Sequence, residues 1–127
     1  MKRKIKVIYV KPDEKATVIE IEDTLEVLQE KVKGDIEAFY AFEDPVAIIC
    51  NESGKISGLT PNRAIRHNGE ILDIIVGNFL IAYVPQDSSN FESLPDTLLY
   101  KYLKMFELPE MFLKDDAGKV IAIKYEP

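Results

Sequence analysis

The apolar run ILDIIVGNFLIAYV, residues 71–84, constrains the fold more than any other part of the sequence. It is interrupted at Asp73, Gly77 and Asn78, and it is too short to cross a bilayer as a helix, which takes about 20 residues. Apolar side chains at successive positions are typical of a strand that is covered on both faces. Two interpretations remain open. The run is either one long central strand with a bulge at Gly77, which the apolar character on both sides of the glycine favours, or two strands that turn at VGN.

The segments before this run predict a hairpin, a helix and two further strands. IKVIYV and TVIEIE flank the turn-forming KPDEKA, so residues 4–22 are expected to form a β-hairpin. DTLEVLQEKVKG predicts a helix, with Asp23 and Glu26 as a capping pair and Gly34 in a left-handed C-terminal cap. DIEAFYAF and VAIIC, which Pro45 separates, are predicted to be strands.

The segments after the run predict a second helix and a terminal hairpin. Ser93 is expected to cap a helix that Pro109 ends and whose apolar stripe consists of Leu99, Tyr102, Leu103 and Phe106. The tail predicts a hairpin that turns at DDAGK. We therefore predict an α+β fold: a single domain over residues 1–127 with a mostly antiparallel β-sheet, two main helices packed on one face of the sheet, and a C-terminal hairpin.

The charge and the cysteine count narrow the classes of function. A formal net charge of −6 argues against nonspecific binding of nucleic acid, because such binding needs a basic face that displaces counterions. The basic start, MKRKIKVIYV, runs into KPDEK without the small-residue cleavage site of a signal peptide. The single cysteine, Cys50, has no partner for an internal disulfide and closes an apolar strand. We expect a packed core thiol in a cytoplasmic protein with no membrane partner.

No arrangement of residues predicts an active site or a metal site. A nucleophile needs a base and an orienting group, and nothing in the sequence brings Cys50, His67 and a carboxylate together. His67 adjoins the turn-forming Asn68-Gly69 and is expected to be exposed. The sequence holds no second histidine and no cysteine pair that would bind a metal. We therefore predict a non-enzyme without catalytic residues, cofactor or metal.

The stretch TPNRAIR, residues 60–66, is the candidate binding site. Thr60 as an N-cap and Pro61 at the first helical position predict a single helical turn. Asn62 and Arg63 would then lie near the N-terminus of the turn, with Arg66 on the same face. Free backbone N–H groups and two guanidinium groups would suit a phosphate or a carboxylate.

A structural role for the same residues remains open. Arg63 and Arg66 would then pair with neighbouring carboxylates such as Glu70 or Asp73, and Asn62 would satisfy backbone groups of a turn. The ligand interpretation gains from Lys55, which adds a third positive charge to residues 51–70 of a chain that is acidic as a whole. An aromatic ring beside the arginines would strengthen it further, because nucleobases stack on such rings.

The order of these motifs resembles a known family. VAIICNESGKISGLTPNRAIRHNGEILDIIVGNFLIAYV, followed by FESLPDTLLYKYLKMF, is similar to the family named domain of unknown function 3846, from about residue 5 to about residue 106. The similarity is carried by the NESGK turn, GLTPNRAIR and GEILDIIVGNFLI. It implies a small accessory protein of a phage or mobile element, and it assigns no catalytic residue.

A phage or mobile-element context favours a protein that acts by binding another molecule and so blocking it. Our first hypothesis is a binding protein that captures an anionic, nucleotide-like small molecule, such as a host-defence signal, through Asn62, Arg63 and Arg66, with assembly into a homo-oligomer as an option. It predicts that Arg63→Ala and Arg66→Ala abolish ligand binding with little change in melting temperature. The alternative is a protein–protein inhibitor or adaptor that docks on a host protein through an acidic surface or a sheet edge.

Overall fold

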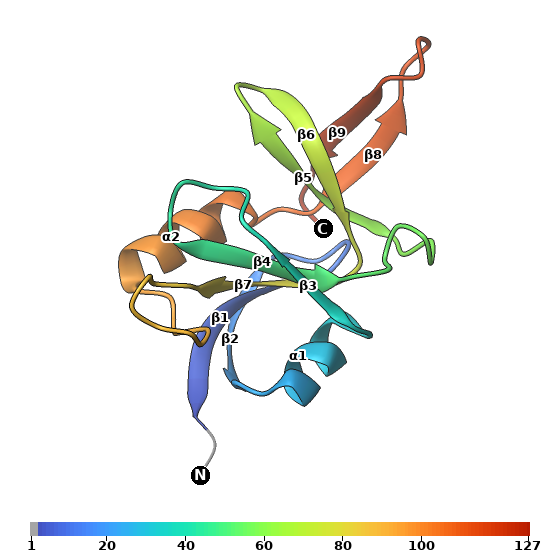
Figure 1. Cartoon of the computed structure of the whole chain (residues 1–127). Coiled ribbons are helices and arrows are strands. Elements are labelled where there is room, and N and C mark those ends of the chain that lie inside the picture. Colours follow the sequence, from blue (N-terminus) through green and yellow to red (C-terminus); the bar gives the residue numbers. More distant parts are fainter. Residues whose placement is uncertain (1–2) are drawn as a thin grey trace.

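A computed structural model describes residues 3–127 and confirms the predicted α+β class (Figure 1). In chain order the elements are β1 (Lys4–Val10), β2 (Thr17–Glu22), α1 (Leu25–Val32), β3 (Ile36–Phe39), β4 (Val46–Asn51), β5 (Pro61–His67), β6 (Glu70–Val76), β7 (Phe79–Tyr83), α2 (Asp96–Met105), β8 (Glu110–Lys114) and β9 (Val120–Lys124). The predicted hairpins at the two ends of the chain are present as β1–β2 and β8–β9.

The strands form one large sheet and two separate hairpins. The sheet has five strands in the order β2-β1-β7-β4-β3, and each neighbouring pair is antiparallel. β5 pairs with β6, and β8 pairs with β9. Figure 1 shows both hairpins standing on one side of the sheet, with α1 on the other side.

Each face of the sheet carries its own hydrophobic core. Along β1, Val7 faces the core that Leu28 of α1 covers, and its neighbour Ile8 faces the core that Tyr102 of α2 covers. The prediction that both helices pack on one face is therefore wrong. Successive residues of the central strands are apolar, so both faces of the sheet need a covering layer. Residues of β5 and β6 help α2 to cover the second face.

The apolar run at residues 71–84 forms two strands, so the favoured single bulged strand is wrong. β6 ends at Val76, the chain turns at Gly77 and Asn78, and β7 becomes the middle strand of the sheet. The turn requires a left-handed backbone, with φ of 74° at Gly77. Residues 79–82 of β7 are completely buried, whereas β6 is buried only at Ile75. Hydrophobicity alone does not separate these two environments.

The stretch TPNRAIR also differs from its prediction, since residues 61–67 are strand β5 and not a helical turn. Asn68 and Gly69 both take positive φ, 51° and 82°, in the predicted tight turn. This turn brings β6 back along β5 as an antiparallel partner. Pairing along the hairpin therefore overrides the helix-start preference of Thr60 and Pro61, and Pro61 occupies the first position of the strand, where a proline is tolerated.

Both helices are present, with caps that differ from those predicted. Thr24, not Asp23, accepts the N-terminal hydrogen bond of α1, and Lys33, not Gly34, takes the left-handed C-terminal position. α2 begins at Asp96, and the Ser93 hydroxyl accepts a hydrogen bond from the backbone N–H of Lys6 on β1. Neither helix in residues 3–127 is long and apolar enough to cross a membrane.

Gly77→Ala is expected to lower the free energy of unfolding by about 2 kcal/mol or more. A left-handed alanine costs roughly 1–2 kcal/mol, and the new Cβ would lie 2.7 Å from Cδ1 of Leu59. Gly118→Ala is the matched control, because φ is also positive there and nothing lies within 4 Å of the new Cβ. Urea denaturation compares the two variants. Equal losses of stability would show that the contact with Leu59 does not matter.

Candidate functional site

Asn62 lies inside the protein, where it joins three segments of the chain. Its side chain is on β5, and the residue is 1 % exposed. The amide nitrogen donates to the carbonyl oxygen of Val10 at 3.1 Å and to that of Gly77 at 2.8 Å. The β6–β7 turn is thereby fixed to the end of β1.

Arg63 is completely buried and is surrounded by backbone carbonyl groups. Nε donates to the oxygen of Phe106 at 3.1 Å, Nη2 to that of Glu14 at 2.6 Å, and Nη1 to the carbonyl and side-chain oxygens of Asn62 at 3.2 and 2.8 Å. Burial lowers the pKa of Arg63, because the charged form is poorly solvated inside the protein. Phe106 ends α2, so the guanidinium also lies at the negative end of the helix dipole.

Arg66 points out of the core and holds the C-terminal hairpin. Its Nη2 donates to a carboxylate oxygen of Glu110 on β8 and, at 3.1 Å, to the carbonyl oxygen of Ala122 on β9. The side chain of Glu110 is 1 % exposed, and its other oxygen accepts from the backbone N–H of Ala64 at 3.2 Å. We call this arrangement of Arg66, Glu110 and Ala64 the hairpin latch.

The three predicted site residues therefore do not form one site. Asn62 and Arg63 have their polar atoms bonded inside the molecule, as the structural interpretation of this stretch expected. The expected acceptors were carboxylates such as Glu70 and Asp73, whereas those of Arg63 are carbonyl groups and an amide oxygen. Arg66 alone of the three lines a large cavity.

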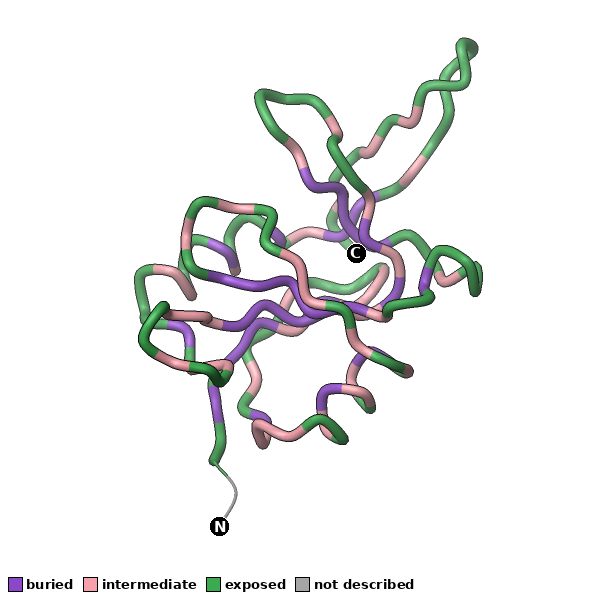
Figure 2. Tube along the Cα trace, viewed as in Figure 1, coloured by how far each residue is buried: buried purple, intermediate pink, exposed green. Residues whose placement is uncertain are grey.

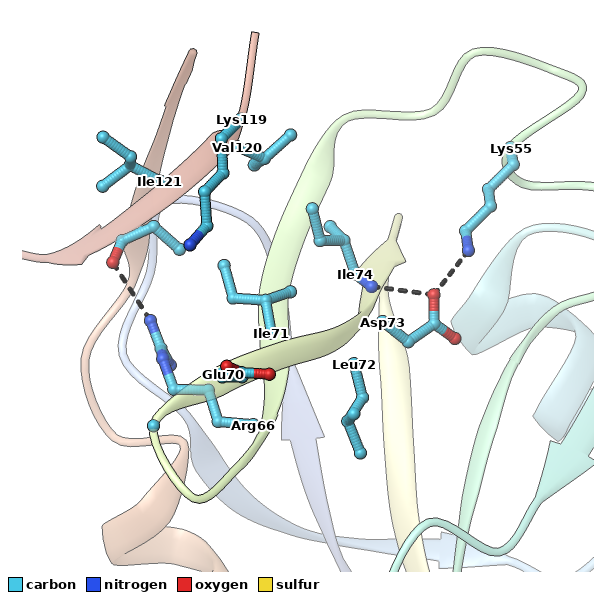
Figure 3. Close-up of a pocket in the computed structure, with 12 residues that line it drawn as sticks. Lys55, Arg66, Glu70, Ile71, Leu72, Asp73, Ile74, Lys119, Val120 and Ile121 are labelled. Carbon is cyan, nitrogen blue, oxygen red and sulfur yellow. Dashed lines mark hydrogen bonds and ion pairs between the residues drawn. The ribbon is translucent and has the colours of Figure 1, made fainter. Parts of the chain in front are cut away.

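That cavity, the hairpin groove, lies between β6 and β9 and has a volume of about 750 Å³ (Figure 3). It is lined by Lys55, Arg66, Gly69, Glu70, Ile71, Leu72, Asp73, Ile74, Lys119, Val120, Ile121 and Ala122. Lys55 and Arg66, two of the three basic residues within residues 51–70, both line the groove, and the tail adds Lys119, whereas Arg63 is buried elsewhere. The sequence did not indicate Lys119, because the fold of the tail against β6 depends on the hairpin latch.

The charges of the hairpin groove largely cancel. Lys55 pairs with Asp73 at 2.6 Å, and Arg66 pairs with Glu110. Of the three basic side chains, Lys119 is the one for which no ion pair is found within residues 3–127. No aromatic ring is among the lining residues, so the groove offers a nucleobase nothing to stack on.

A second feature is the uncovered face of the β8–β9 hairpin. Met111 pairs with Ile123 and Leu113 with Ile121, so these four side chains share one face. Each is between 40 and 48 % exposed, and Figure 2 shows the outer part of the hairpin as mostly exposed chain. We call these four residues the apolar hairpin face. The sequence predicted the hairpin but not that this face stays uncovered.

The family follows from the sequence comparison. A family model described as Domain of unknown function (DUF3846) matches residues 5–107. The chain belongs to the DUF3846 family. No curated protein and no solved structure matches it. The matched region ends before β8, so the β8–β9 hairpin of this DUF3846 protein lies outside the part that the family model covers.

The residues of this DUF3846 protein that could act as a nucleophile, a base or a metal ligand are not grouped together in the structure. Cys50 is buried on β4 as predicted, and burial raises the pKa of its thiol to about 11, far from that of a reactive thiolate. His67 is exposed beside the Asn68-Gly69 turn, as predicted. No group of three or more His, Cys, Asp or Glu side chains among residues 3–127 is placed to hold a metal ion.

Arg63→Ala is expected to lower the free energy of unfolding by at least about 3 kcal/mol. The change leaves three backbone carbonyl groups and the Asn62 amide oxygen without their donor inside the protein. The first hypothesis requires the opposite, a nearly unchanged stability. Lys55→Ala, which removes an exposed ion pair, is the control and should change stability by about 0.5 kcal/mol. Urea denaturation of both variants measures the difference. Similar unfolding midpoints for Arg63→Ala and Lys55→Ala would refute the structural role of Arg63.

Proposed function

We propose that this DUF3846 protein is a non-enzymatic binding module of the cytoplasm that docks on a host protein as an inhibitor or adaptor. The observation that carries the proposal is the apolar hairpin face. Four large apolar side chains stand exposed on a two-stranded hairpin, and no second layer among residues 3–127 covers them. Contiguous exposed apolar surface rimmed by polar residues is typical of protein interaction sites.

The build of the hairpin supports this proposal. An isolated two-stranded hairpin is marginally stable in water, and it gains stability when a further strand or layer covers its apolar face. The hairpin latch already holds the base of β8–β9 through Arg66 and Glu110. The apolar hairpin face is therefore presented in a defined orientation, so that docking a partner orders few additional groups.

Capture of an anionic small molecule in the hairpin groove is the second candidate. It is favoured by Arg66, whose Nε and Nη1 make no hydrogen bond within residues 3–127, and by Lys119. The volume of about 750 Å³ suits a small ligand. The groove gives less support to an anion than to a protein partner, because two of its three cations already pair with carboxylates.

The docking proposal is tested with the double variant Leu113→Ser, Ile121→Ser. The tagged protein is used to recover partners from the cells in which it occurs, and recovered proteins are purified and titrated against it. We expect a stoichiometric partner whose affinity falls at least tenfold in the double variant. Tyr100→Ser is the control, because this side chain is 67 % exposed and belongs to α2, a different element from the hairpin. Equal affinities for all three proteins would refute docking through the apolar hairpin face.

The second candidate is tested by calorimetry with adenosine triphosphate and inorganic phosphate as probes. Anion capture in the hairpin groove predicts binding that Lys119→Ala weakens at least fivefold and that rising salt weakens further. Lys4→Ala, on the far end of β1, is the control for general charge effects. Absence of binding, or equal weakening by both variants, would refute this candidate.

A further inference from the structure

The walls of the hairpin groove are strand edges. β9 and the residue before it contribute the consecutive residues 119–122, and β6 contributes residues 70–74. Side chains of consecutive residues point to opposite faces of a strand, so one face would contribute alternate residues only. No residue of β8 lines the groove. The groove therefore lies against the edge of β9 that faces away from β8.

The free edge of β9 has hydrogen-bonding groups available. Within the hairpin, the N–H of Asp115 donates to the carbonyl of Lys119 at 2.9 Å, and the N–H of Tyr125 donates to that of Pro109 at 3.0 Å. In an antiparallel pair such bonds recur at every second residue, so the backbone groups of Val120 and Ala122 point away from β8. Arg66 occupies the carbonyl of Ala122. Both backbone groups of Val120 remain without a partner in the described residues.

The opposite edge, on β6, is less open. The side chain of Asp73 accepts a hydrogen bond from the outward N–H of Ile74 at 2.8 Å, and Lys55 holds the same oxygen at 2.6 Å. Charged side chains that cap an edge in this way keep other strands from pairing with it. β9 is therefore the edge at which a strand can be added.

We propose, resting on the docking function above, that the partner supplies an extended segment that pairs with the free edge of β9 at Val120. The added strand turns the two-stranded hairpin into a three-stranded sheet. Every second side chain of the added strand contacts Ile71 and Ile74 in the hairpin groove. The side chains between them lie on the same side as the apolar hairpin face. Backbone pairing supplies affinity, and apolar side chains at every second position supply selectivity.

The basic residues at β9 itself, in contrast to the balanced charges of the rest of the hairpin groove, indicate that this segment is acidic. Lys119 precedes β9, and Lys124 is its last residue, with its ammonium 3.4 Å from the carbonyl oxygen of Met105. Nε and Nη1 of Arg66, beside Ala122, make no hydrogen bond within residues 3–127. The sequence KVIAIK, residues 119–124, contains no acidic residue. A second copy of β9 would place its two lysines on an edge that already carries two, which disfavours self-pairing. A partner strand with alternating apolar and acidic residues is complementary to this edge.

The test uses a phage-displayed library of random octapeptides, selected on the full-length protein. The decisive variant is Val120→Pro, which removes the outward N–H and leaves the bonds to β8 intact. Lys114→Pro is its matched control, because Lys114 is the cross-strand partner of Val120 and its N–H points to the other edge of the hairpin. Both variants are first checked for an unchanged melting temperature, to within a few degrees.

We expect selected peptides with alternating apolar and acidic residues. Their affinity should fall at least tenfold in Val120→Pro and stay within twofold in Lys114→Pro. Methylation of the backbone nitrogens on one edge of the peptide should abolish binding, and methylation on the other edge should not. This second measurement tests the same pairing without any change in the protein. Selection of no peptide that depends on Val120, or equal effects of methylation on both edges, overturns the inference.

The outcomes separate this inference from the docking function. If a purified partner loses affinity for the Leu113→Ser, Ile121→Ser variant but binds Val120→Pro as well as the unchanged protein, docking stands and strand addition is wrong. If neither change affects the partner, both are wrong. Loss of affinity in Val120→Pro but not in Lys114→Pro supports strand addition to β9.

Discussion

The buried guanidinium group of Arg63 is the interaction on which the arrangement of the other elements depends. Its acceptors belong to the β1–β2 loop at Glu14, the end of α2 at Phe106, and β5 itself. Burying a charge without a carboxylate partner is costly unless every donor is satisfied. Carbonyl oxygens of three separate segments accept from its three nitrogens here, so the buried group ties these segments together in the folded protein. A lysine has three donors on a single nitrogen and does not match acceptors spread around a planar group.

Asn62 extends the same network toward the sheet. Its side-chain oxygen accepts from Arg63, and its nitrogen donates to Val10 and Gly77. The end of β1, the β6–β7 turn and the end of α2 are thus joined through two adjacent residues of β5. Figure 2 shows buried chain continuing from the central strands into the base of the hairpins, where this network lies. The position of the β5–β6 hairpin over the sheet follows from these polar contacts as much as from its apolar residues.

The sequence predicts correctly those elements that are determined by residues close together in the chain. The β1–β2 hairpin and the DDAGK turn are encoded within a few residues of each other, and both are present. The role of Arg63 depends on acceptors 43 and 49 residues away, at Phe106 and Glu14, which no local pattern contains. The prediction of a helical turn for TPNRAIR is wrong for the same reason, because pairing with β6 outweighs the preference of Thr60 and Pro61 for a helix start. The sequence indicates Arg66 as a candidate site residue and Lys55 as an added positive charge, but nothing local in the sequence relates Lys119 in the tail to either of them.

The hairpin latch gives the last residue of the predicted site a role that differs from that of the other two. Asn62 and Arg63 bond within the region matched by the family model, whereas Arg66 reaches Glu110 and Ala122, beyond residue 107 where the match ends. Glu110 contributes a carboxylate that is almost completely buried and is bonded on both oxygens, so it fixes the base of β8–β9 to β5. Apart from the contact of β8 with β5, the hairpin makes few contacts with the other helices and strands, and four of its apolar side chains are exposed. The base of the hairpin is fixed, whereas the apolar side chains of its outer half are exposed. A second molecule that buries these side chains would gain hydrophobic free energy from the contact. Under the proposed docking function, the binding surface is the C-terminal hairpin, and Arg66 orients it through Glu110 and Ala122.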